Sequence, residues 1–285
     1  MVWRWFQIPW GLLLFVSLHC FVLTTPIDLE TSIRPEEIAL VQYDSRKMED
    51  YWLASALWNK FYCNQHRHQF IYYSANAQCQ YDKENPLASP WCKVKAMIQA
   101  NNDYPTVKVF VYMDSDAVVD MKFKNVPVNT LLKTMQTKMH WDPETKPMVF
   151  NQDGPCWWCG LIKRVGYDKC LNAGTVLWYR HTESEKVLND WWNAAMDSYA
   201  TNPIKRKFRI KWPWEQDRQM AVYNRTPEHI QIAPDPDSSE MSNNFGWSNW
   251  CLSHLPGHGC FISHHCAHKG SKAKLIELYK VPTGR

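Results

Sequence analysis

The sequence has little net charge. Its 32 lysine and arginine residues are nearly balanced by 28 aspartate and glutamate residues, which leaves a formal charge of +4. So small an excess argues against nucleic acid as a partner, because proteins that bind phosphate backbones concentrate positive charge. The basic run at residues 204–211, IKRKFRIK, is a local exception. It indicates a solvated face or, less often, a surface that meets an anionic ligand.

The sequence also lacks internal repeats, a low-complexity tail and any long apolar run beyond its N-terminus. A chain of 285 residues can bury a substantial core, as one large domain or two small ones. Its composition is ordinary for a globular protein except for 16 tryptophans and 13 tyrosines. Aromatic faces can bind sugars, but packing in the core is their more common use.

The N-terminal apolar stretch covers residues 5–25 and follows Arg4. It is long enough to span a bilayer, and its most apolar part also suits a signal peptide. We therefore predict that residues 1–25 are a cleaved signal peptide or an uncleaved anchor, followed by a short linker at 26–35. Either arrangement places the rest of the chain in the secretory lumen.

Ten cysteines fit that compartment, because an oxidising lumen permits disulfides. If Cys20 belongs to the leader, an odd number remains. At least one cysteine outside the leader is then expected to be a free thiol.

Hydrophobic spacing predicts alternating strands and helices in the first half of the chain. In order they are strand 38–43, helix 50–64, strand 69–73, helix 89–100 and strand 107–113. This order implies a parallel sheet with right-handed crossovers and ligands at the carboxyl ends of the strands.

The second half of the chain is less regular. It contains a strand within 165–180 and a helix that begins at a capping box of Thr182 and Glu185. A short helix starts near Glu215, and residues 234–260 are predicted to form a long ordered loop.

Two carboxylates, Asp114 and Asp116, end the third predicted strand. An Asp-x-Asp pair alone is common, but the end of a buried strand is where this sheet should bind its ligand. Mn²⁺ and Mg²⁺ prefer carboxylate oxygens and share their coordination shell with substrate phosphates. The pair therefore predicts a divalent metal site that meets the phosphates of a nucleotide.

Six blocks in order resemble glycosyltransferase family 34, which includes plant xyloglucan xylosyltransferases, galactomannan galactosyltransferases and fungal mannan galactosyl- and mannosyltransferases. The most specific is MDSDAVVDMKFKNVP at 113–127. The others are WNKFYCNQH (58–66), WCKVKAM (91–97), LNAGTVLWYR (171–180), DRQMAVY (217–223) and HHCAHK (264–269). The resemblance spans roughly residues 38–272.

The resemblance implies an α/β fold of the GT-A type, a Rossmann-like, mostly parallel sheet flanked by helices. A single catalytic domain would cover residues 36–280, with a nucleotide-binding half at 36–120 and an acceptor-binding half at 121–280. The implied activity is retaining transfer of a galactose-, xylose- or mannose-class sugar from a nucleotide diphosphate to a glycan or polysaccharide. UDP-sugars are favoured as donors, with GDP-mannose as the alternative, and Mn²⁺ or Mg²⁺ is the implied cofactor. The chain would lie in the Golgi or ER lumen as a type II membrane protein, or be secreted after cleavage of the leader. Both a monomer and a homo-oligomer are compatible with the resemblance.

The resemblance also implies roles for individual residues. Metal ligands would be Asp114, Asp116 and His264. Donor-binding residues would be Asp114, Ser115, Asp116, Lys93, Asn172, Gly174 and Lys269, and Lys269 would contact the phosphates. The chain departs from the family pattern at two places. The family has glycine where this chain has Ala267, and it has Pro-Cys where this chain has Gly-Ser at 270–271. Both departures lie in the predicted phosphate loop.

Asp217 and Gln219 would be the catalytic residues, next to the reacting sugar. Retention can use a carboxylate nucleophile, as in retaining glycosidases, but the sequence shows no paired carboxylates here beyond Glu215 and Asp217. We therefore expect a front-face mechanism in which the departing diphosphate takes the acceptor proton.

Structural alternatives exist for several of these residues. Asp217 could instead be an acidic helix N-cap, Lys93 an exposed helix lysine, and Gly174 part of a turn.

Two other functions are compatible with the sequence. One is a catalytically inactive, glycan-binding protein of the same fold. The other is a secreted zinc-dependent hydrolase, because histidines and cysteines cluster at 254–268. The spacings in that cluster match no closed tetrahedral zinc pattern.

Overall fold

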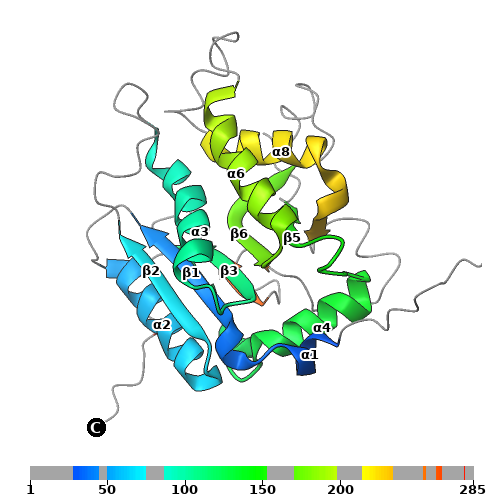
Figure 1. The fold of residues 1–285 in the computed structure, drawn as a ribbon. Helices are drawn as coiled ribbons and strands as arrows, with labels where there is room; N and C mark the ends of the chain where they lie inside the picture. The colour runs from blue at the N-terminus through cyan, green and yellow to red at the C-terminus, as the bar shows by residue number, and fades with distance from the viewer. Residues whose placement is uncertain are drawn as a thin grey trace, which may run out of the picture.

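The computed structural model describes residues 28–44, 50–74, 87–152, 170–197, 214–233, 253–254, 261–264 and 279. They form a six-stranded sheet, in the order β2-β1-β3-β6-β5-β7, between two layers of helices (Figure 1). The strands are β1 Ile38–Asp44, β2 Gln69–Ser74, β3 Val109–Asp114, β5 Met148–Gln152, β6 Leu171–Tyr179 and β7 Ile230–Ala233. The predicted leader lies outside the described residues. Within the described part of the chain, no helix is long and apolar enough to cross a membrane.

Five of these strands share one direction, and β6 runs against them. β1 pairs in parallel with β2 and β3, and β5 pairs in parallel with β7. β6 is antiparallel to both β3 and β5. The α/β fold with a mostly parallel sheet is therefore confirmed, while the reversal of β6 was not predicted.

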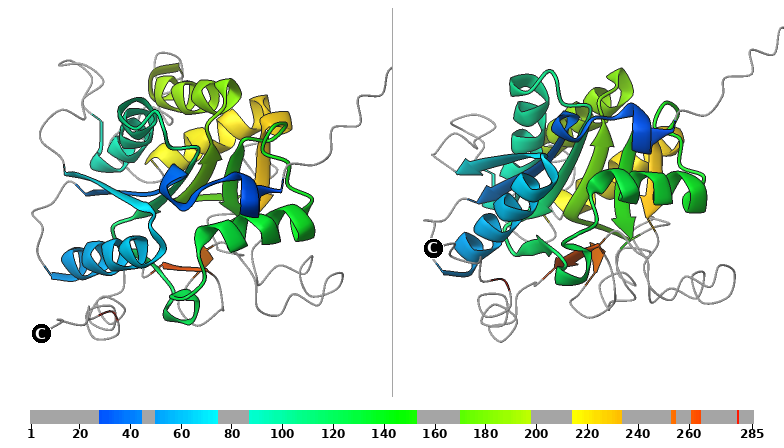
Figure 2. Two further views of the ribbon diagram at one scale, coloured as in Figure 1. Left: turned by 60° about the horizontal axis from the view of Figure 1, so that its bottom comes forward. Right: turned by 90° about the horizontal axis from the view of Figure 1, so that it is seen from below.

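Helices cover both faces of the sheet (Figure 2). α2 (Asp50–His66), α4 (Val128–Met139) and the short α1 (Leu29–Ser32) pack on one face. α3 (Cys92–Asp103), α6 (Thr182–Asp197) and α8 (Trp214–Arg225) pack on the other.

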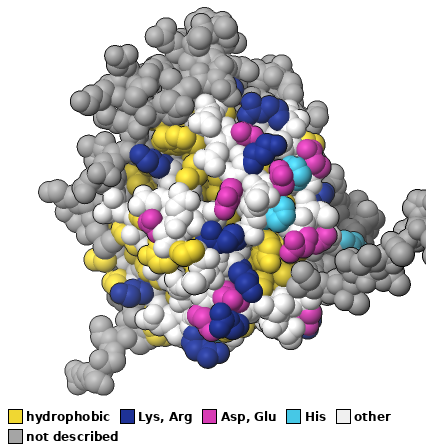
Figure 3. All heavy atoms as spheres, in the orientation of Figure 1, with side chains coloured by type: hydrophobic (Ala, Val, Ile, Leu, Met, Phe, Trp, Pro, Cys, Tyr) yellow, Lys and Arg dark blue, Asp and Glu magenta, His cyan; other side chains and the backbone are white. Residues whose placement is uncertain are grey.

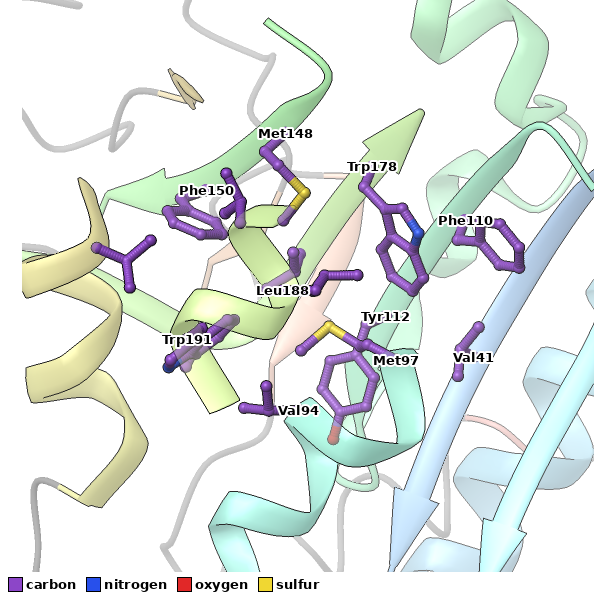
Figure 4. Close-up of a cluster of buried hydrophobic side chains, with 14 of the residues drawn as sticks. Val41, Val94, Met97, Phe110, Tyr112, Met148, Phe150, Trp178, Leu188 and Trp191 are labelled. Carbon is purple, nitrogen blue, oxygen red and sulfur yellow. The ribbon is translucent and has the colours of Figure 1, made fainter. Parts of the chain in front are cut away.

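Strand β3 shows how the two cores are divided. Phe110 and Tyr112 face α3 and α6, whereas Val111 and Met113 face α2 and α4, as the two-residue period of a strand requires. Figure 4 shows the first of these cores, where Phe110 and Trp178 stack with ring centroids 4.7 Å apart. On the face seen in Figure 3, basic and acidic side chains of the described residues are interspersed, which accords with the small net charge.

A second, small sheet lies on the α2 and α4 side. It consists of β4 (Ala117–Val119), β9 (Ile262–His264) and β8 (Ser253–His254), in the order β4-β9-β8. β8 lies within the predicted loop at 234–260, and β9 lies just after it. Most of that predicted loop lies outside the described residues.

Short 3-10 helices complete the described fold: η1 Pro35–Glu37, η2 Ser89–Trp91, η3 Met121–Phe123 and η5 Pro227–His229. The predicted helix at 89–100 thus begins as η2 and continues as α3 to Asp103. The predicted free thiol is confirmed at Cys63, which is buried.

The predicted capping box of Thr182 and Glu185 is wrong. In the structure, the Glu183 backbone N–H donates to His181 Nδ1 at 3.2 Å. The His181 backbone N–H donates to Ser184 Oγ at 3.1 Å. Glu185 is turned to α3, where it accepts a hydrogen bond of 2.8 Å from Asn101 Nδ2. The start of α6 is therefore capped by His181 and Ser184, one residue earlier than the spacing suggested.

His68, in the connection between α2 and β2, should make stability depend on pH. Its Nε2 accepts from the Val128 N–H at 3.2 Å, so its Nδ1 carries the proton and donates to the Pro35 carbonyl at 2.9 Å. Burial lowers the pKa of His68 to about 4, below the roughly 6.5 of an unfolded chain. The unfolded chain thus binds the proton more readily, so stabilisation is complete above about pH 6.5 and is lost as the pH falls through 4.

We expect the free energy of unfolding to fall by roughly 3 kcal/mol between those pH values, and His68→Gln to flatten this slope. Urea denaturation over a pH series measures it. Asn129→Ala is the control, because it removes a bond of 2.6 Å to the Ile33 carbonyl without removing a titratable group. Equal slopes in the wild type and His68→Gln would contradict the prediction.

Candidate active site

The acidic pair lies at the carboxyl edge of the sheet, where the sequence places it. Asp114 is the last residue of β3 and pairs with Tyr43 near the end of β1. Asp116 stands in the turn that connects β3 to β4. Both aspartates are partly exposed, and Ser115 between them is buried. The pair is therefore accessible at the edge where parallel strands of this kind bind ligands.

A buried lysine joins Asp114 to helix α8. Lys93 Nζ lies 2.8 Å from Asp114 Oδ1 and 2.9 Å from Glu215 Oε1. Lys93 donates a hydrogen bond to Asp114 Oδ2 at 3.1 Å, and the Tyr112 hydroxyl donates one to Asp114 Oδ1 at 3.0 Å. The three elements that carry the site, α3, β3 and α8, are thus connected by charged groups. The alternative of an exposed helix lysine is wrong, because Lys93 is 7% exposed.

The charges in this network stabilise one another. Burial disfavours the ammonium of Lys93, but Asp114 and Glu215 raise the pKa of Lys93 above its ordinary value. Burial raises the pKa of Glu215, and Lys93 opposes that rise. Burial together with Asp114 raises the pKa of Tyr112, so its hydroxyl keeps its proton and donates. Lys93 is therefore a permanent cation at the edge of the site.

Two buried oxygens on α8 are acceptors without a hydrogen-bond partner among the described residues. They are Glu215 Oε2 and Gln219 Oε1, on side chains that are 2% and 0% exposed. Buried oxygens in native proteins nearly always accept a hydrogen bond from protein, water or a ligand. These two are therefore available to a hydroxyl-bearing ligand or to ordered water.

The two predicted catalytic residues are buried within α8. Asp217 is 1% exposed and forms an ion pair of 2.7 Å with Arg218. Gln219 Nε2 lies 3.5 Å from the carbonyl of Asn172 on β6. The α8 side chain that Lys93 joins to Asp114 is Glu215, which the sequence indicated only as a possible partner of a nucleophile. Its position in the first turn of α8 is the signal that could have identified it.

Asn172 and Gly174 stand at a bulge in β6. Phe150 of β5 pairs with Val176, but the next residue, Asn151, pairs with Asn172, so residues 173–175 bulge between these pairs. Asn172 Oδ1 accepts a hydrogen bond of 2.7 Å from the Gly174 N–H within the bulge. Bulges next to active sites redirect side chains and backbone. The predicted donor-binding residues therefore lie where β6 bends, on the strand that neighbours β3.

The acidic turn is held from the α2 side. The Ala117 carbonyl accepts hydrogen bonds from Ser55 Oγ at 2.9 Å, Asn59 Nδ2 at 3.0 Å and Gln42 Nε2 at 3.2 Å. Gln42 also donates to the carbonyl of Asp114, at 3.0 Å. These bonds fix the backbone on either side of Asp116. Sequence reasoning missed all three donors.

The residue types and their backbone positions fit a divalent cation. β9 pairs with β4 so that His264 lies opposite Ala117, one residue beyond Asp116. Two carboxylates and an imidazole form a donor set that suits Mn²⁺. Only the backbone of His264 is described, and among the side chains that the structure describes no group of three or more potential ligands occurs. Lys269 and most of the histidine and cysteine cluster of the zinc alternative lie outside the described residues.

A family model supplies the decisive comparison. The model described as the galactosyl transferase GMA12/MNN10 family matches residues 38–233. The chain belongs to this family. This GMA12/MNN10 family member is therefore a glycosyltransferase, and the resemblance found in the sequence is confirmed. Membership implies a nucleotide-sugar donor, usually with a divalent metal, and a glycan acceptor.

One solved structure with a TM-score above 0.5 agrees on the fold of the family member. A glycosyltransferase involved in the glycosylation of the major capsid of PBCV-1 is similar, with a TM-score of 0.55 at 16% identity, over 85% of this chain and 99% of that one. The galactosyltransferase LgtC, in complex with donor and acceptor sugar analogues, gives 0.42 at 12% identity, over 86% and 98%. Mouse xyloside xylosyltransferase 1 gives 0.43 at 10% identity, over 80% and 97%. No curated protein sequence matches the chain.

Proposed function

We propose that this enzyme is a metal-dependent, retaining glycosyltransferase that moves a galactose-, xylose- or mannose-class sugar onto a glycan or polysaccharide. The donor is a nucleotide-diphosphate sugar, with UDP favoured over GDP. One observation carries the proposal: Lys93 is held between Asp114 and Glu215 at the sheet edge, next to Asp116. A pair of carboxylates with a fixed cation suits a ligand that combines a metal with a diphosphate.

Asp114, Asp116 and His264 would hold Mn²⁺ or Mg²⁺. When bound, such an ion neutralises negative charge that grows on the leaving diphosphate. Lys93 donates a hydrogen bond to Asp114 Oδ2 and Tyr112 donates one to Asp114 Oδ1, so this carboxylate needs little reorganisation when the donor binds. Lys269 is proposed to contact the phosphates, by resemblance alone.

The buried acceptors on α8 suit the sugar. Glu215 Oε2 and Gln219 Oε1 can each accept a hydrogen bond from a hydroxyl of the donor or the acceptor. The carboxylates of Glu215 and Asp217 form ion pairs with Lys93 and Arg218, which lowers the nucleophilicity of both. This supports a front-face reaction, in which the acceptor proton passes to the departing diphosphate.

A donor screen tests the proposal. The protein from residue 26 onward is incubated with each sugar nucleotide, with and without glycan acceptors, and products are identified by mass spectrometry. We expect one nucleotide sugar to be consumed with Mn²⁺, no consumption after chelation, and full recovery when Mn²⁺ is added back.

Two outcomes would favour the other functions. A glycan that binds while every nucleotide sugar persists would indicate an inactive, glycan-binding protein. Stoichiometric zinc with hydrolysis in the absence of nucleotide would indicate a hydrolase.

The proposed location is the Golgi or ER lumen, with residues 1–25 as the anchor. Protease protection of the full chain in microsomes tests this, and digestion without detergent would contradict it.

A further inference from the structure

Asp120 connects the acidic turn to the strand that carries His264. Its backbone N–H donates to the Phe261 carbonyl at 2.9 Å, and its Oδ2 accepts a hydrogen bond from the Ser263 hydroxyl. Its other oxygen accepts from the Lys122 N–H at 2.9 Å and so begins η3. Asp120 is 9% exposed and Ser263 2%. A single residue thus binds β9 through its side chain, and the residue just before β9 through its backbone.

The side-chain bond is compatible with only one register of β9. Ser263 pairs with Val118, so its side chain shares a face with Val118 and with Asp120, two residues further on. A slip of one residue would turn Ser263 to the other face and leave the Oδ2 oxygen of Asp120 buried without the Ser263 hydroxyl. β4 and β9 each have only three residues, so their backbone bonds alone define the register weakly. His264 lies opposite Ala117 only in this register.

β4 itself cannot shift to follow a displaced β9. Asn59 Oδ1 accepts from the Val119 N–H at 3.0 Å, and Trp58 Nε1 donates to the Val119 carbonyl at 2.8 Å. Figure 2 shows β8 and β9 in orange on the α2 and α4 side of the main sheet. With β4 fixed by α2, the bond between Asp120 and Ser263 holds the short strand β9 in this register.

We infer that Asp120 is a positioning residue, which through Ser263 sets the register of β9 and so keeps the His264 backbone opposite Ala117, next to the acidic pair. It acts on metal affinity through His264 and takes no part in the chemistry. The inference rests on the proposed metal dependence.

The direct test measures the affinity of the protein from residue 26 onward for Mn²⁺, by electron paramagnetic resonance of the free ion. We expect Ser263→Ala and Asp120→Ala each to weaken binding by about tenfold, as the loss of an outer-shell partner does in other metal sites. Ser263→Thr keeps the hydroxyl and should restore the affinity. Asn129→Ala is the control, since it removes a buried hydrogen bond on α4 and should leave Mn²⁺ binding unchanged.

A double-mutant cycle tests the route through His264. In a His264→Ala background, Ser263→Ala should cause no further loss of Mn²⁺ affinity, because the two effects share one path. An equal loss in both backgrounds would overturn the inference, as would wild-type affinity in both Ser263→Ala and Asp120→Ala. If the wild type binds no Mn²⁺, the proposed metal dependence fails, and the inference fails with it.

Discussion

Asp116→Asn is expected to lower the turnover of the nucleotide sugar by roughly 10³-fold, which corresponds to a loss of about 4 kcal/mol of metal-assisted stabilisation. Asparagine keeps the shape of the side chain but removes the charge that attracts the cation. Stability should be nearly unchanged, because Asp116 is partly exposed and the bonds to the neighbouring Ala117 carbonyl come from other side chains. Assays of donor turnover, Mn²⁺ affinity and thermal unfolding test these expectations.

The matched control is Asp142→Asn. Asp142 is exposed and lies shortly before β5, at the amino edge of the sheet, opposite the acidic pair. The same change of charge there should leave both turnover and Mn²⁺ affinity at the wild-type level. If Asp116→Asn turned over donor as fast as this control, the metal site would not include Asp116.

The first half of the fold could be predicted because its elements carry strong patterns. Each of β1, β2 and β3 begins and ends within two residues of its predicted bounds. β1 and β3 are buried on both faces and read as apolar runs, and α2 carries a stripe at helical spacing. The reversal of β6 has no such signal. A central strand buried on both faces is apolar in either direction, so only the pairing in space decides between them.

Helix α4 was missed although its signal was present, and two short strands were missed for want of one. α4 buries Val128, Leu131, Leu132 and Met135 at spacings of three and four, which is typical of an amphipathic helix. β5 and β7 have only five and four residues, too few for a clear period. The second half of the chain looked irregular because its regular elements are short or separated by long connections.

In the site too, features that depend on neighbouring residues could be predicted from the sequence, whereas contacts between distant residues could not. The place of Asp114 and Asp116 follows from the strand that precedes them. The bond from Lys93 to Glu215 joins two helices far apart in the sequence, and no spacing encodes it. The same holds for β9, a strand of three residues that pairs with β4 from near the C-terminus. Sequence motifs therefore identified the residues of the site, whereas the contacts that orient their side chains are seen only in the structure.

Lys93→Met should have the largest effect on stability. It leaves Asp114 and Glu215 without their shared cation, and Glu215 is 2% exposed. Removing one member of a buried ion pair costs about 3–5 kcal/mol, because the remaining charge is buried without compensation. For a domain of this size that corresponds to a fall in melting temperature of roughly 10 °C. Thermal and urea unfolding measure the loss, and donor turnover should be lost as well.

The double variant Lys93→Met with Glu215→Leu separates the charge from the packing. Replacing both members of a buried pair by apolar side chains is often close to neutral, so we expect it to be more stable than Lys93→Met alone. Activity should not return, because Asp114 still lacks its cation and α8 has lost the oxygen that can accept a sugar hydroxyl. A double variant no more stable than Lys93→Met would mean that Glu215 is not the uncompensated charge. A double variant that turned over donor would show that the network between α3, β3 and α8 serves only the fold.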